Sequence, residues 1–328
     1  MRIRLAILVA TALSACGTST TTTTETDVAA DVTVAADTVG ADATDAAAGT
    51  DATALPAKAT ETVGGARPVD VTVPDDWTPQ KKWPLILVLH GYGASGSVQS
   101  AFLGVAARAT QYGFVTLAPD GTRDPSGSLF WNATPACCDF GHVNVDDVAY
   151  LGGLIDEAIA KLAVDPARVY VVGHSNGGFM AYRLACELSA KVTAIAVIAG
   201  ATNPDATACG KPKAVNVLHI HGTKDATISY DGGTIQIAGF TGATYPSAQG
   251  SIQQWLDRDG CSGSATSAGK ADYDLNVAGA ETDRLQYLNC PNGIAVEHWQ
   301  MAGSGHIPGF TDDFREALPT WLLARTRP

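Results

Sequence analysis

The segment Val171–Met180, VVGHSNGGFM, sets Ser175 in the pattern Gly-x-Ser-x-Gly between an apolar run and a helical pattern. A serine nucleophile is typically held at such a strand-to-helix turn, which is so tight that side chains two positions away would collide. The helix that follows directs its positive end toward developing negative charge. The alternative is a serine that only caps the helix. Because the strand and helix patterns flank it on the correct sides, we predict that Ser175 is a nucleophile.

A serine hydroxyl needs a general base, and in this arrangement the chain order is nucleophile, acid, histidine. Five of the seven histidines precede or adjoin Ser175 or lie in predicted core strands: His90, His142, His174, His219 and His221. His298 lies inside the strand pattern VEHWQM, so its side chain should face the sheet. His306 lies in GSGHIPGF, a glycine-rich loop just beyond the last predicted strand. We predict that His306 is the base.

The orienting acid should follow a strand end between these two residues. Asp225 directly follows the run VNVLHIHGTK, whereas Asp231 lies six residues later in the turn pattern YDGG. Asp205, in NPDATAC, is a weaker candidate. An orienting carboxylate must reach the imidazole from a fixed position, so we predict Asp225.

An acyl-transfer site also needs hydrogen-bond donors for an oxyanion. One would be the backbone N–H of Asn176, directly after the nucleophile, and the other should come from the loop after an early strand. That loop is LHGYGASG, in which Tyr92 N–H is the best candidate, although the stretch could be only a turn. The composition gives no sign of a metal site, and we expect no cofactor.

Short apolar runs alternate with helical patterns from about Gly64 onward, as expected for buried parallel strands and their covering helices. The predicted strands are 68–74, 85–90, 114–119, 169–173, 194–199, 215–221 and 295–301. The predicted helices are 98–112, 147–162, 176–188, 252–257 and 312–325, with Pro319 starting a new turn in the last. We therefore predict one α/β domain with a mostly parallel, doubly wound sheet, whose ligand site lies at the carboxyl ends of the strands.

Six blocks together resemble the esterase/polyhydroxybutyrate-depolymerase family, which is similar to feruloyl and acetylxylan esterases. They are LHGYGASG, APDGT, WNATPACCDFGHVNVDDVAYL, VVGHSNGGFMAYRLACE, LHIHGTKD and GSGHIPGF, in this order, over about residues 65–328. The resemblance implies the α/β-hydrolase fold and the triad Ser175, Asp225 and His306. The chain departs from the family after the histidine, where a tryptophan-proline pair is common and Ile307-Pro308 stands here.

The substrate expected from these features is an ester that is linked to a polymer, of the feruloyl-polysaccharide or polyhydroxybutyrate type. Trp131 lies in a loop of about two dozen residues after the strand ending at Pro119, and loops of that length are usually functional. We expect its indole to form an apolar wall for a bulky acyl group, the alternative being a core aromatic. Acetylxylan esterase or acyltransferase activity on the same triad, or a surface binding module without chemistry, are the other functions considered.

The formal net charge of −12 argues against nucleic-acid binding, which needs a surplus of Lys and Arg. Residues 18–58 hold seven acidic residues against one basic residue and no aromatic residue. Such a stretch cannot bury enough apolar surface to offset the entropy lost on ordering, so residues 17–63 are predicted to be a disordered tether. The catalytic domain would then span residues 64–328, and we expect it to be a monomer.

The first sixteen residues, MRIRLAILVATALSAC, combine two arginines, a short apolar run and small residues before Cys16. The run is too short to cross a bilayer and has the layout of a secretory signal. Its end, Leu-Ser-Ala-Cys, resembles the bacterial lipobox, in which the cysteine is lipidated, whereas a cleaved signal with a chance cysteine is the alternative. We predict an exported protein that contacts the membrane only through lipid on Cys16.

Six cysteines remain after Cys16, and an even number in an exported chain favours disulfides. Cys186, at the end of the predicted helix after Ser175, is expected to pair with Cys209. Cys261 is expected to pair with Cys290 and close the loop before the last strand. Cys137 and Cys138 are adjacent and could be bridged or reduced.

The lipid anchor can be tested by detergent phase partitioning of the full chain expressed with its own leader. The wild type should enter the detergent phase, because acyl chains on Cys16 add apolar surface, and Cys16→Ser should remain in the aqueous phase. Recovery of both proteins in the aqueous phase would contradict the anchor.

Overall fold

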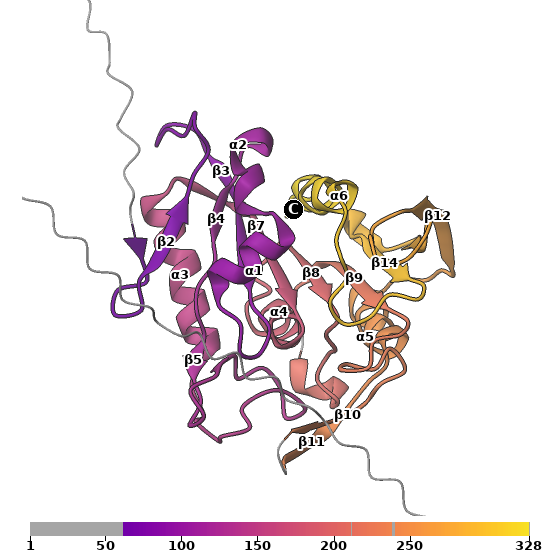
Figure 1. The fold of residues 1–328 in the computed structure, drawn as a ribbon. Coiled ribbons are helices and arrows are strands. Elements are labelled where there is room, and N and C mark those ends of the chain that lie inside the picture. Colours follow the sequence, from indigo (N-terminus) through magenta and orange to yellow (C-terminus); the bar gives the residue numbers. More distant parts are fainter. Residues whose placement is uncertain (1–61, 211, 238–239, 328) are drawn as a thin grey trace, which may run out of the picture. The chain divides into compact units, whose positions relative to one another are not determined.

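The computed structural model describes residues 62–210, 212–237 and 240–327, and its centre is a ten-stranded sheet (Figure 1). From one edge to the other the strands are β1 (Thr62–Val63), β2 (Val69–Thr72), β4 (Val115–Leu117), β3 (Trp83–Leu89), β7 (Val164–His174), β8 (Ala194–Ile198), β9 (Asn216–Gly222), β14 (Val296–Met301), β13 (Thr282–Tyr287) and β12 (Ala265–Ala271). The six strands from β4 to β14 are parallel to their neighbours, and the strands at both edges are antiparallel. The prediction of a mostly parallel α/β sheet is confirmed.

The order of the central strands defines where a site can form. The chain runs from β3 to β4 on one side and later returns to β7 on the other side of β3. In open parallel sheets the crevice at such a reversal, beyond the carboxyl ends of the strands, is where ligands bind. The ends of β3 and β7, at Leu89 and His174, flank this crevice.

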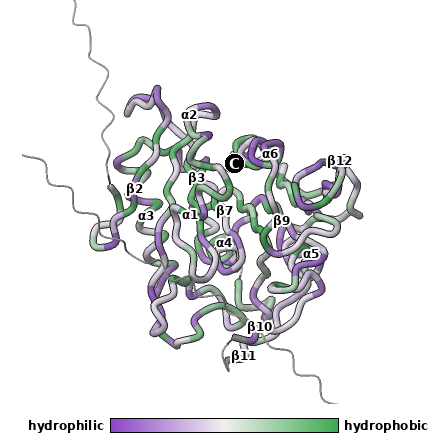
Figure 2. Tube along the Cα trace, viewed as in Figure 1, coloured by the Kyte–Doolittle hydropathy of each residue, from purple (hydrophilic) through white to green (hydrophobic). Residues whose placement is uncertain are grey.

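The central strands are apolar on both faces, because helices cover the sheet from both sides. All seven residues of β3 are buried, and they alternate between two cores. Leu85, Leu87 and Leu89 belong to one core, and Ile86 and Val88 belong to the other. Figure 2 shows hydrophobic residues concentrated along this central part of the sheet.

Two groups of helices complete these cores. Helices α3 (Asp147–Lys161), α4 (Asn176–Glu187) and α5 (Ala248–Asp259) contribute Leu151, Phe179 and Ile252 to the first core. Helices α1 (Gly96–Leu103) and α6 (Asp312–Leu323) contribute Leu103 and Phe314 to the second core. No helix of the described ranges has both the length and the hydropathy that a membrane span requires.

The predicted helix 98–112 is wrong as a single element. Helix α1 ends at Gly104, whose φ of 68° is a left-handed conformation that glycine adopts without a steric penalty. A 3₁₀ turn (Ala106–Arg108) and the short helix α2 (Ala109–Tyr112) follow. The expected new turn at Pro319 is also absent, since this residue lies inside the continuous helix α6.

Strands β12 and β13 were not predicted. Six of the seven residues of β12, ATSAGKA, are exposed, so no alternation of apolar and polar residues marks this strand. Two small hairpins were missed as well, β5 (Thr122–Arg123) with β6 (Leu129–Phe130) and β10 (Gly233–Ile237) with β11 (Phe240–Tyr245). Two 3₁₀ turns, Ala206–Cys209 and Pro291–Gly293, complete the elements.

The structure contains the two expected long-range disulfides. Cys186 at the end of α4 is bonded to Cys209, and Cys261 after α5 is bonded to Cys290. Cys137 and Cys138, whose state the sequence left open, form a vicinal disulfide. The first bridge ties the loop between β8 and β9 to the helix that follows Ser175.

The boundary expected at Gly64 is two residues too late. Thr62 and Val63 pair with β2 as strand β1, and Val63 is buried in the first core. An apolar side chain that reaches the core adds enough burial to order the strand. The signal segment with Cys16 and the rest of the tether lie outside the described residues.

Candidate active site

Ser175 occupies the tight turn between β7 and α4. Its φ of 55° and ψ of −121° are unusual for a residue with a side chain, as expected for a strained turn that presents a hydroxyl. A Cβ on Gly173 would overlap the Gly177 carbonyl, and a Cβ on Gly177 would overlap Leu89 O. Ser175 makes no side-chain capping hydrogen bond, which excludes the helix-cap interpretation.

The three residues of the predicted triad are in hydrogen-bonding contact. Ser175 Oγ lies 3.0 Å from His306 Nε2, and His306 Nδ1 lies 2.7 Å from Asp225 Oδ2. These side chains come from the turn after β7, the loop after β9 and the loop after β14, which are separated by up to 131 positions in the sequence. A carboxylate can only accept, so Nδ1 carries the hydrogen and Nε2 is free to accept the serine proton.

The Asp225 carboxylate is buried and saturated with donors. Oδ1 accepts hydrogen bonds from the backbone N–H groups of Thr227 and Ile228, both at 2.8 Å. Oδ2 accepts from His306 and also faces His221 Nε2 at 3.3 Å. Burial alone would raise the pKa of Asp225, but the hydrogen bonds from His221, His306 and Ile228 lower it below its usual value. Asp225 is therefore an anion at neutral pH.

His174 contacts the backbone of His306. His174 Nε2 lies 2.9 Å from the backbone oxygen of His306, so the ring N–H donates to that carbonyl. Burial lowers the pKa of His174 to about 4, and repulsion between two protonated rings, His174 and His306, contributes to the shift. Sequence reasoning treated His174 as a structural strand residue. Its position next to Ser175 was visible, but nothing in the sequence showed that the His306 loop folds back onto it.

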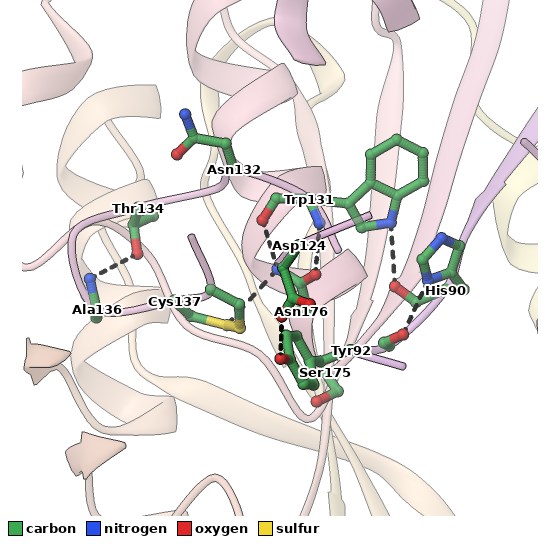
Figure 3. The surroundings of a disulfide bond; sticks show 12 residues. His90, Tyr92, Asp124, Trp131, Asn132, Thr134, Ala136, Cys137, Ser175 and Asn176 are labelled. Atoms are coloured by element: carbon green, nitrogen blue, oxygen red, sulfur yellow. Dashed lines mark hydrogen bonds between the residues drawn. A yellow bond between two sulfur atoms is a disulfide. The ribbon is translucent and has the colours of Figure 1, made fainter. Parts of the chain in front are cut away.

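The side chain of Asn176 connects the Ser175 turn to the long loop after β6 (Figure 3). Its Oδ1 accepts from Trp131 N at 2.7 Å, and its Nδ2 donates to Trp131 O at 2.9 Å. Nδ2 also lies 3.6 Å from Cys137 Sγ of the vicinal disulfide. One carboxamide thus satisfies both backbone groups of a buried residue, which otherwise would lack partners.

Trp131 is a core aromatic, the alternative considered for it, and does not form the expected apolar wall for an acyl group. Its side chain is fully buried, and its indole N–H donates to His90 O at 3.1 Å (Figure 3). The hydrogen bond explains the burial, because it satisfies the single polar atom of the indole. Trp131 therefore holds the long loop against the end of β3 and presents no surface to a substrate.

The loop Gly91–Gly93 lies directly against Ser175. A Cβ on Gly91 would be 3.3 Å from Ser175 Cβ, so the backbone approaches closely there. The phenol of Tyr92 donates a short hydrogen bond to Asp124. Among the described backbone–backbone hydrogen bonds of loops and turns, neither Tyr92 N–H nor Asn176 N–H is a donor.

The other candidates for the base and the acid, His298, Asp205 and Asp231, make no described hydrogen bond to Ser175 or His306. His298 is buried in β14, where burial lowers its pKa to about 3, and neither ring nitrogen has a described hydrogen-bond partner. Asp205 and Asp231 are exposed, and neither contacts His306 among the described hydrogen bonds. The described residues contain no cluster of side chains that could hold a metal ion.

A pocket of about 590 Å³ lies beside the long loop, between α4 and α5. Its walls include Asn132, Cys137, Arg183 and Arg258. The residues Ser175, Asp225 and His306, all of them described, are not among the residues that line this pocket.

The sheet order and the Ser–His–Asp geometry define a protein with the α/β-hydrolase fold. The family described as Phospholipase/Carboxylesterase matches residues 77–236. Acetyl xylan esterase from Aspergillus awamori shares the fold with a TM-score of 0.54 and 13% identity, over 80% of this chain and 98% of that one.

The curated proteins that are similar in sequence to this chain are named as esterases. The Nocardia uniformis subsp. tsuyamanensis protein named "Putative esterase NocK" is 30% identical over 72% of this chain and 68% of its own length. Feruloyl esterase B of Piromyces equi is 29% identical over 74% of this chain and 43% of its own length. A bifunctional acetylxylan esterase/xylanase of Neocallimastix patriciarum is 25% identical over 79% and 34%. This chain thus spans less than half the length of the last two. It belongs to the esterases of the α/β-hydrolase type.

Burial of histidines makes the stability of this protein sensitive to acid. Burial lowers the pKa values of His90, His174, His219 and His298 below their usual value. In the unfolded chain they titrate near about 6.5, so as the pH falls below that value the unfolded state takes up protons that the folded state does not. The free energy of unfolding should therefore fall between pH of about 6.5 and about 4.

Urea unfolding of the wild type and His298→Phe across this pH range measures the effect. Removing one buried histidine should reduce the slope by about 1.4 kcal/mol per pH unit. Equal slopes in the two proteins would contradict the assignment of His298 as a neutral buried ring.

Proposed function

We propose that this protein is a serine carboxylic-ester hydrolase that works through an acyl-enzyme on Ser175. The observation that carries the proposal is the continuous hydrogen-bonded series from Ser175 Oγ through His306 to the buried Asp225 carboxylate. A neutral imidazole between a hydroxyl and an anion is arranged to accept one proton and to be stabilised as a cation.

The reaction has two balanced halves. Ser175 Oγ attacks the ester carbonyl while His306 Nε2 takes its proton, and the C–O bond to the alcohol then breaks as His306 returns the proton to the leaving oxygen. Water next attacks the acyl-enzyme, His306 takes a proton from this water, and the Ser175 oxygen leaves with that proton. Asp225 keeps the hydrogen on Nδ1 throughout and stabilises the transient imidazolium.

The negative charge of each tetrahedral intermediate requires donors that are fixed in advance. The N–H groups of Asn176 and Tyr92 fill this role. The first begins α4, where the helix dipole adds positive potential, and the second lies in the Gly91–Gly93 loop against Ser175. The Asn176 carboxamide, through its bonds to Trp131, positions its own backbone N–H.

The substrate class is an ester linked to a polysaccharide, with feruloyl as the acyl group. Relatives named as feruloyl and acetylxylan esterases support this class. A polyester of the hydroxybutyrate type is the second candidate substrate. Polymers of either kind cannot enter a cell, so an exported and lipid-anchored enzyme is the arrangement we propose.

Three variants test the roles of the triad. Ser175→Ala should reduce kcat for p-nitrophenyl acetate by about 10⁶-fold and Asp225→Asn by about 10⁴-fold, because nucleophile and orienting acid act as a unit. Thr227→Ala, which retains the backbone N–H to Asp225, serves as the control and should keep kcat within about twofold. Hydrolysis that persists in Ser175→Ala would contradict the proposal.

A substrate panel tests the class. Specificity constants, kcat/KM, should be highest for feruloylated arabinoxylan fragments and methyl ferulate, and lower for acetylated xylan and a hydroxybutyrate oligomer. Trp131→Phe should leave this ranking unchanged, because the buried indole does not touch substrate. A preference for the hydroxybutyrate oligomer would overturn the assignment of a polysaccharide ester.

A further inference from the structure

Three histidines and a tyrosine are buried behind Asp225 and have no part in the mechanism above. His219 and His221 point from β9, His298 points from β14, and Tyr182 belongs to α4; all four side chains are at most 2% exposed. Burying polar rings is costly unless they are hydrogen-bonded. This cluster therefore requires an explanation.

Three of these side chains form one series of contacts. Tyr182 Oη lies 2.8 Å from His219 Nδ1, and His219 Nε2 lies 3.2 Å from His221 Nδ1. His221 Nε2 lies 2.8 Å from Ile228 O and 3.3 Å from Asp225 Oδ2. His298 touches the series only through its ring, edge-on to His219, and joins none of these hydrogen bonds.

The donor and the acceptor of every hydrogen bond in the series follow from the contacts of its last member, His221. A carbonyl and a carboxylate can only accept, so His221 Nε2 must carry hydrogen. In a neutral ring Nδ1 then bears a lone pair and accepts from His219 Nε2. The remaining nitrogen of His219, Nδ1, accepts from the Tyr182 hydroxyl. Burial lowers the pKa of His219 and raises the pKa of Tyr182, which is consistent with a neutral His219 ring and an intact phenol.

The series continues into the triad through one residue, Ile228. Ile228 accepts from His221 at its carbonyl and donates from its own N–H to Asp225 Oδ1. The positive N–H edge of His221 also faces Asp225 Oδ2, the oxygen that His306 contacts. Both oxygens of the carboxylate are thus contacted either by His221 or by the residue that His221 binds.

We propose that His221 is a positioning residue of the triad, and that Tyr182 and His219 act on Asp225 by fixing the tautomer of His221. The proposal rests on the proposed serine esterase function and extends it. If His219 reversed its tautomer, His221 would have to hydrogen-bond through Nδ1, and its bare Nε2 would face two oxygen atoms. The turn that carries Asp225 would then lose its anchor, and the imidazole of His306 would lose its orientation.

The tautomers can be read without substrate by ¹⁵N NMR of the full chain labelled at histidine. His219 and His221 should each show a protonated Nε2 and a bare Nδ1 at neutral pH. A hydrogen on Nδ1 of either ring would overturn the proposal. This measurement is independent of activity, so it stands even if Ser175-dependent hydrolysis proves absent, a result that would refute the proposed function instead.

A matched pair of variants then links the series to catalysis. Tyr182→Phe removes the first donor, and Tyr170→Phe removes a buried hydroxyl that instead donates to Arg325 O. We expect Tyr182→Phe to lower kcat by about fivefold, the equivalent of one net hydrogen bond, with KM unchanged and the ¹⁵N signals of His221 shifted. Tyr170→Phe should leave all three quantities unchanged. Equal losses in both variants, or no loss in Tyr182→Phe, would overturn the proposal.

Discussion

The buried negative charge of Asp225 is the constraint on which the rest of the site depends. An anion removed from water must be surrounded by donors, and here two backbone N–H groups, His306 and His221 supply them. Because these donors are fixed to the turn after β9 and to the loop after β14, the carboxylate sets the position of both. The position of Asp225 therefore fixes the position of the His306 ring, and the Ser175 hydroxyl is in contact with that ring.

The second constraint is steric and acts at Ser175. The left-handed backbone at this residue is tolerated because Gly173 and Gly177 leave room for the crossing chain. Asn176 then uses its side chain to bind Trp131 and contact Cys137, which joins the turn to the long loop. The turn, this loop and the Gly91 segment are thus joined by direct contacts at the ends of β3 and β7.

Local sequence patterns predict the central strands and three residues whose side chains the structure brings into hydrogen-bonding contact, Ser175, His306 and Asp225. The pattern Gly-x-Ser-x-Gly indicates the tight turn in which it lies. Fully buried strands such as β3 have sequences that are unbroken apolar runs. The sequence-based prediction failed for elements and side chains whose structure depends on contacts with residues distant in the sequence. The exposed strand β12 is ordered by pairing with β13, and Trp131 is buried by a hydrogen bond to His90, which is 41 positions away. His174 and His221 acquire their roles through loops that fold back onto them, and neither contact can be read from spacing.

The proposed mechanism requires a covalent intermediate at Ser175, and rapid-quench kinetics with p-nitrophenyl acetate and intact-mass analysis test for it directly. We expect a burst of p-nitrophenol equal to the enzyme concentration, together with an added acetyl mass that maps to the peptide containing Ser175. Linear product release with no burst, and an unmodified Ser175 peptide at every quench time during turnover, would contradict the central claim.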